Sequence, residues 1–113
     1  MIWKNVGSLD NIPRCGARRL CFGHNGRPIA VFRTGDDAVH AVVDQCPHRA
    51  GPLSEGIVSG HLVTCPLHNW VIDLSSGDAV APDEGHVETL PVRIENREIH
   101  VGIPRRPTSE EAA

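Results

Sequence analysis

Two short segments of the 113-residue chain each carry one cysteine and one histidine. Residues 46–48 read Cys-Pro-His and residues 65–68 read Cys-Pro-Leu-His, with sixteen residues between His48 and Cys65. Thiolate and imidazole are both good ligands for transition metals. Prolines and glycines interrupt the surrounding sequence, and short loops between strands can aim side chains at a common point. The pattern therefore predicts one metal centre with two cysteine and two histidine ligands, Cys46, His48, Cys65 and His68.

Two kinds of metal centre accept this ligand set. Zinc does so, but its usual sites pair Cys with Cys and His with His along the sequence. A [2Fe-2S] cluster with mixed ligation takes two thiolates on one iron and two imidazoles on the other. Because each segment here offers one Cys and one His, each would supply one ligand to each iron. The spacing favours the iron-sulfur cluster, and a zinc-bound or cluster-free interaction module is the alternative.

Around the four ligands the sequence resembles the Rieske iron-sulfur family. The segment that follows the second ligand pair, DLSSG at 73–77, is similar to that of soluble Rieske ferredoxins. Within the family, three stretches are most similar to the small subunits of assimilatory NAD(P)H nitrite reductases: CPHRAGPLSEGIV at 46–58, CPLHNW at 65–70 and AVAPDEG at 79–85. The resemblance runs from about residue 43 to residue 103.

This resemblance implies a role for each ligand and for the chain. Cys46 and Cys65 would hold the inner iron, whereas His48 and His68 would hold the outer, redox-active iron near the surface. The chain would be the electron-transfer subunit of an oxidoreductase, with no catalytic residue of its own. Its partner would be a large subunit with FAD, a [4Fe-4S] cluster and sirohaem. That subunit would reduce nitrite to ammonium at NAD(P)H expense, in nitrate assimilation.

The alternative function is that of the Rieske ferredoxin component of an aromatic-ring-hydroxylating dioxygenase. Such a ferredoxin uses the same cluster and nearly the same fold, so the two functions differ in the redox partner. Co-purification with a large flavin- and sirohaem-containing chain would favour the nitrite reductase. Acceptance of electrons from a ferredoxin reductase would favour the dioxygenase system.

Short β-strands are expected to position the ligand loops. Alternating apolar residues and turn signals predict three strands in a meander, with Asn25-Gly26 in the first turn: 18–23, 28–33 and 38–44. The same reasoning predicts short strands and a closing hairpin further on: 61–64, 70–73, 92–95 and 99–103. The predicted fold class is all-β, an antiparallel β-sandwich with a small loop-rich cluster-binding lobe at about residues 44–81.

Composition limits the function classes further. The chain has 11 Lys+Arg against 14 Asp+Glu, a net charge of -3 and no basic cluster, so nucleic acid is not an expected partner. No apolar run approaches the roughly 18 residues of a membrane span, and no leader segment opens the sequence, which favours a cytoplasmic protein. We expect residues 1–103 to form one domain and residues 104–113 a disordered tail.

The remaining cysteines and histidines show no ligand spacing. Cys15 and Cys21 are expected to be unpaired thiols. Packing is the expected role of Trp70. Surface or packing roles are expected for five histidines that stand singly in the sequence: His24, His40, His61, His86 and His100.

Overall fold

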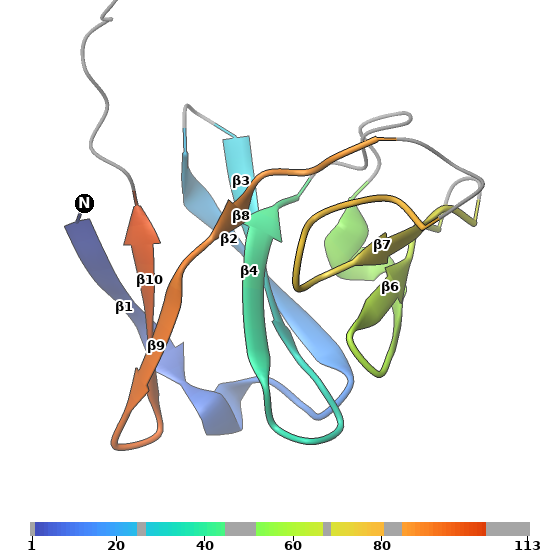
Figure 1. Ribbon diagram of the computed structural model, residues 1–113. Helices are drawn as coiled ribbons and strands as arrows, with labels where there is room; N and C mark the ends of the chain where they lie inside the picture. The colour runs from blue at the N-terminus through green and yellow to red at the C-terminus, as the bar shows by residue number, and fades with distance from the viewer. Residues whose placement is uncertain (1, 25–26, 45–51, 67–68, 81–84, 104–113) are drawn as a thin grey trace, which may run out of the picture.

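The computed structural model describes residues 2–24, 27–44, 52–66, 69–80 and 85–103 (Figure 1). These residues form ten β-strands and two short 3-10 turns, and no α-helix is present among them. In chain order the elements are β1 (Ile2–Ser8), η1 (Leu9–Asn11), β2 (Gly16–His24), β3 (Arg27–Arg33), β4 (Val39–Val43), η2 (Leu53–Glu55), β5 (Ile57–Ser59), β6 (Leu62–Thr64), β7 (Val71–Asp73), β8 (Thr89–Leu90), β9 (Val92–Glu95) and β10 (Glu98–Ile103).

The strands make three antiparallel sheets, and the predicted all-β class is confirmed. One sheet has the order β1-β10-β9, the second β2-β3-β4-β8 and the third β5-β6-β7. In Figure 1 the second sheet stands between the other two. The first two sheets form the β-sandwich, and the third sheet belongs to the smaller lobe. The predicted bounds for the domain, the lobe and the tail remain predictions, and residues 81 and 104–113 lie outside the described part of the chain.

Strand β3 is buried on both of its faces. Ile29 and Val31 point into the core between the two sandwich sheets, whereas Ala30 and Phe32 point into the core of the lobe, and all four are fully buried. This division follows from the two-residue period of a strand. We call these two groups of buried side chains the sandwich core and the lobe core. The lobe is thus packed directly on the outer face of the second sheet.

The predicted hairpins are found close to their expected bounds. Strand β3 pairs with β2 on one side and with β4 on the other, which is the predicted meander. The closing hairpin of β9 and β10 turns at Asn96 and Arg97, which adopt positive φ angles of 51° and 64°. Two consecutive positive φ angles are typical of the tight turn whose twist matches that of the flanking strands.

Three strands were not predicted from the sequence. Strand β8 has two residues and pairs with β4. Strand β1 pairs with β10 at the edge of its sheet, and its first four residues are exposed, so no apolar alternation marks it. Strand β5 is only three residues long and pairs with β6. All three strands are defined by their partners rather than by a local sequence pattern.

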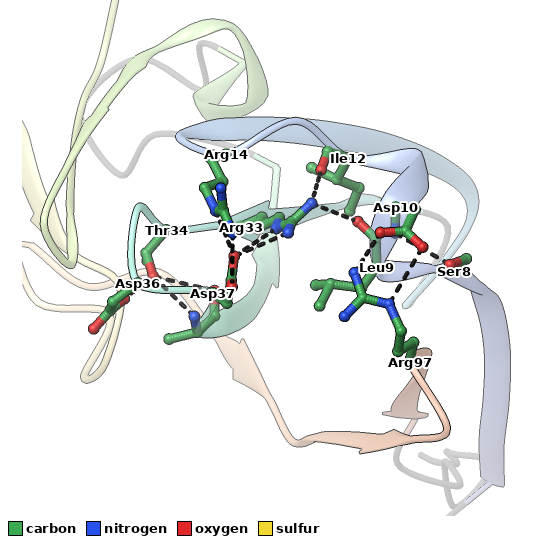
Figure 2. Close-up of polar contacts among 11 residues, drawn as sticks. Ser8, Leu9, Asp10, Ile12, Arg14, Arg33, Thr34, Asp36, Asp37 and Arg97 are labelled. Atoms are coloured by element: carbon green, nitrogen blue, oxygen red, sulfur yellow. Dashed lines mark hydrogen bonds and ion pairs between the residues drawn. The ribbon is translucent and has the colours of Figure 1, made fainter.

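A buried arginine joins two connections at one end of the sandwich, and Figure 2 shows its contacts. Arg33 is 7% exposed and donates from Nη1 to the carbonyl oxygens of Leu9 and Ile12, at 3.1 and 2.9 Å. Its Nε also donates to Asp37 Oδ1 at 3.0 Å, and Arg14 binds the same carboxylate from outside. These contacts join the connection between β1 and β2 to the turn between β3 and β4.

Within the described ranges, no helix is long and apolar enough to span a membrane.

Candidate metal centre

Cys65 is the one predicted ligand that lies within the described residues. It directly follows β6, carries a free thiol and is 1% exposed, because its side chain is part of the lobe core. A buried, unpaired thiol at the end of a short strand fits a ligand of the inner iron. Three other predicted ligands lie outside the described part of the chain, and their assignment remains a prediction: Cys46, His48 and His68.

The loop that begins at Cys65 is closed by backbone hydrogen bonds. The Cys65 N–H donates to the Trp70 carbonyl at 2.6 Å, and the Asn69 N–H donates to the Cys65 carbonyl at 3.1 Å. Asn69 reverses the chain with a positive φ of 59°, a conformation that asparagine tolerates better than most residues. Trp70 packs against the lobe core, which confirms its predicted packing role. The two ends of the second ligand segment, at Cys65 and at Asn69 and Trp70, are therefore held together between β6 and β7.

Strand pairing brings the end of the first ligand loop beside the start of the second. Ile57 of β5 is paired with Thr64 of β6, so Gly56 and Cys65 are the next residues along these two strands. A Cβ atom at Gly56 would lie 2.3 Å from the Thr64 carbonyl oxygen and 2.9 Å from Val63 Cγ2. Since contacts under 3.0 Å are essentially never adopted by real Cβ atoms, only glycine fits. The close approach places residue 56, which follows the first predicted ligand pair, next to β6, which leads to Cys65.

Asp44 holds the base of the first ligand loop. Its side chain has no exposed area, and its Oδ1 accepts from the Ser54 N–H at 2.7 Å while Oδ2 accepts from the Ser54 hydroxyl at 2.6 Å. Oδ2 also lies 3.3 Å from Arg19 Nε. Sequence reasoning missed this group, because an acidic residue and a serine next to turns are ordinary turn residues.

Two histidines predicted to stand singly contact each other across the two parts of the fold. His40 of β4 and His61 of the turn between β5 and β6 are joined by a hydrogen bond of 2.9 Å from Nε2 to Nδ1, with the rings edge to face. His61 Nε2 is 3.6 Å from Asp36 Oδ2. Burial, and then the neighbouring His61, hold the pKa of His40 below its ordinary value of 6.5. The sequence gives no signal for this pair, whose members are 21 residues apart.

Three further residues complete the outcome of the sequence predictions. Cys15 is exposed and unpaired, as expected. The side chain of Cys21 is outside the described part of the structure. His86 is exposed, as expected for a surface residue, and its Nδ1 lies 2.8 Å from Asp78 Oδ1.

A family model, a curated relative and the solved structures all relate this chain to Rieske-type proteins. The model of the Rieske-like [2Fe-2S] domain matches residues 2–102. The chain is 35% identical over 102 residues to the anthranilate 1,2-dioxygenase ferredoxin subunit of Burkholderia cepacia. This alignment covers 89% of this chain and 92% of that protein. It superposes on the ferredoxin of carbazole 1,9a-dioxygenase from Nocardioides aromaticivorans IC177 with a TM-score of 0.80 and 25% identity, over 92% of this chain and 100% of that one.

A further solved structure has the same fold. It is described as a candidate NADH-dependent nitrite reductase small subunit from Mycobacterium tuberculosis, and it superposes with a TM-score of 0.81 at 24% identity, over 92% of this chain and 96% of that one. At this identity the likeness is one of fold. Because the family model spans nearly the whole chain, the protein belongs to the Rieske-like [2Fe-2S] family, and it is an electron-transfer protein whose cofactor is a Rieske [2Fe-2S] cluster.

Proposed function

We propose that this protein is the Rieske electron-transfer subunit of a cytoplasmic, NAD(P)H-dependent assimilatory nitrite reductase. What supports the proposal is the sequence of residues 46–58, 65–70 and 79–85, which resembles that of the small subunits of those enzymes. A Rieske cluster supplies reversible one-electron transfer when bound. The reduction of nitrite to ammonium would take place on a large partner subunit that bears FAD, a [4Fe-4S] cluster and sirohaem.

We further propose that Cys46 and Cys65 hold the inner iron and that His48 and His68 hold the outer iron. The burial of Cys65 supports its place at the inner iron, since a buried thiolate keeps that end of a cluster dry. The pairing of Ile57 with Thr64 supports a shared site, because it brings the two ligand loops together at one end of the lobe.

The ligand proposal is tested by EPR of the dithionite-reduced protein together with iron and zinc analysis. The wild type should bind two irons per chain and show the rhombic signal of low average g value that is typical of histidine ligation. Cys65→Ser and His68→Cys should each abolish that signal. Cys15→Ser is the matched control, because Cys15 is an exposed, unpaired thiol outside the loops. An unchanged signal in His68→Cys would refute the assignment.

A second candidate function is supported by the identity to a dioxygenase ferredoxin. The chain is 35% identical to the anthranilate 1,2-dioxygenase ferredoxin subunit over almost its full length. In this case the protein would carry electrons from a ferredoxin reductase to the oxygenase component of an aromatic-ring-hydroxylating dioxygenase. The lobe, the strand pairing and the cluster would serve both functions equally, so the partner decides between them.

The discriminating experiment presents the cluster-loaded protein to both classes of partner. If the proposed function holds, the protein co-purifies with a large sirohaem-containing chain, and its addition increases nitrite-dependent NAD(P)H oxidation by that chain. Cys65→Ser should bind without this increase if the cluster carries the electrons. Rapid reduction by a ferredoxin reductase, with turnover of an aromatic dioxygenase and no effect on nitrite reduction, would overturn the nitrite reductase proposal.

A further inference from the structure

The base of the first ligand loop is fastened by a carboxylate that has no contact with solvent. Asp44 is 1% exposed, and a carboxylate can be buried only when donors satisfy its oxygens. Both Asp44 oxygens have a donor on Ser54, at 2.7 Å for Oδ1 and 2.6 Å for Oδ2. Hydrogen bonds to an ionised acceptor are stronger than neutral ones. The hydrogen bonds between Asp44 and Ser54 therefore join the two ends of a chain segment, ten positions apart, that contains Cys46 and His48.

Both ends of this closure are anchored in the fold. The Asp44 N–H donates to the Pro28 carbonyl at 2.9 Å, which fastens the exit of β4 to the start of β3. On the other side, Ser54 lies in η2 next to Leu53, which is fully buried in the lobe core. The loop thus leaves from a residue that is hydrogen-bonded to β3 and returns to an element that is packed in the lobe core. Asp44 sets the separation of these two points.

Arg19 adds a third contact from β2. Its Nε lies 3.3 Å from Asp44 Oδ2, and the arginine side chain is 49% exposed while the aspartate side chain is not exposed at all. Since the guanidinium remains in contact with water, it neutralises the buried charge without being buried itself. The Asp44 side chain is therefore held by two hydrogen-bond donors on η2 and by one ion pair with β2.

We propose that Asp44, acting through Ser54, is the positioning residue of the first ligand loop and sets how firmly Cys46 and His48 hold the cluster. The proposal rests on the ligand assignment given above. The role proposed for Asp44 is one of position, and it acts through its contacts with Ser54. Its effect is to reduce the number of loop conformations from which the cluster can be lost.

The test compares cluster retention and EPR spectra in a set of anaerobically purified, cluster-loaded variants. Ser54→Ala removes one hydrogen bond and leaves the Ser54 N–H contact, so it should fold and release iron to a chelator about tenfold faster than the wild type. Asp44→Ala should release iron faster still, and the reduced EPR signal of both variants should broaden as the loop samples more conformations. Ser54→Thr keeps the hydroxyl and should restore the wild-type rate and line width.

Asp10→Ala is the matched control, because Asp10 forms an exposed ion pair with Arg97 at the far end of the sandwich (Figure 2). It should retain iron as the wild type does. The proposal is overturned if Ser54→Ala and Asp44→Ala match Asp10→Ala in iron release, or if they change only the unfolding temperature and leave the EPR line width unaltered. Cys46→Ser separates this result from a failed ligand assignment. A normal cluster in Cys46→Ser would refute the assignment, whereas loss of the cluster there with wild-type behaviour of Asp44→Ala would refute the positioning role alone.

Discussion

Replacement of Gly56 by alanine should separate the two ligand loops. The new Cβ would lie 2.3 Å from the Thr64 carbonyl oxygen, and that oxygen belongs to the backbone of β6, which cannot move aside as a flexible side chain can. Val63 Cγ2, at 2.9 Å, closes the other side. Strand β5 must therefore shift away from β6 at the point where Cys65 follows. Overpacking of this kind costs about 3 kcal/mol at the upper end of its usual range.

The expected result is a lower unfolding temperature and poorer cluster retention. For a domain of this size, about 3 kcal/mol corresponds to a fall of about 12 to 20 °C in the thermal midpoint. Anaerobic thermal unfolding followed by circular dichroism would measure this shift, and iron analysis of the same sample would measure the occupancy of the centre. Occupancy should fall because the displaced strand carries the return of the first loop.

Gly35→Ala supplies the matched control. A Cβ at Gly35 would meet only Cys15 Sγ, at an ordinary contact distance of 3.5 Å, and Gly35 has no positive φ angle. Its effect on stability should stay within about 0.5 kcal/mol. If Gly56→Ala unfolds at the temperature of Gly35→Ala and retains its iron, then β5 and β6 tolerate separation, and the reasoning from close approach is wrong.

Three other changes test the polar contacts of the fold. Arg33→Met should lower the free energy of unfolding by about 3 to 5 kcal/mol, because it removes the donor to two backbone carbonyls and one ion-pair partner of Asp37. Arg14→Met removes only an exposed ion pair and should lower it by less than about 1 kcal/mol. Equal losses for the two variants in denaturant titrations would contradict this reasoning. His40 has a lowered pKa, so the unfolded chain binds its proton first, and the stability present above pH 6.5 should be lost as the pH falls below that value. His40→Gln should weaken this loss in thermal scans between about pH 7.5 and about pH 5.5, and an unchanged slope would speak against the histidine pair. Hydrogen bonds from Arg14 and then Arg33 hold the pKa of Asp37 at about 2. The stability that the ionised carboxylate supplies is therefore complete above pH 3.8 and is lost as the pH falls from 3.8 towards 2. Asp37→Asn should remove this part of the acid unfolding transition, and an unchanged transition in the variant would contradict the prediction.

The sandwich strands could be predicted because their own residues carry the pattern. Ile29, Ala30, Val31 and Phe32 alternate between two buried faces, and their apolar character marks β3 whichever partner it has. Strand β1 carries no such pattern, since Lys4 and Asn5 interrupt it and its first half is exposed. Its existence depends on the backbone groups of β10, which no local property of residues 2–8 reveals.

In the candidate site, too, some features could be predicted from the sequence and others could not. The proposal that Cys65 is a ligand rests on its residue type and its spacing, both of which the sequence displays. The roles of Gly56 and Asp44 depend on which atoms lie across from them, and those atoms belong to residues eight and ten positions away on other elements. The contact between His40 and His61 depends on how the lobe lies on the second sheet. Such relations appear only when the register of the strands is known.

The two ligand loops start from different parts of the fold, and the contacts of Asp44 and Gly56 lie where the first loop leaves and returns. The first loop leaves β4 of the sandwich at Asp44, whereas the second leaves β6 of the lobe at Cys65. Their separation is therefore set by the packing of the lobe on β3, where Phe32 is fully buried, and by the return of the first loop beside β6 at Gly56. With the proposed ligands on both loops, the cluster would itself bridge sandwich and lobe. Iron binding and lobe packing would then stabilise each other, because each fixes the distance that the other requires.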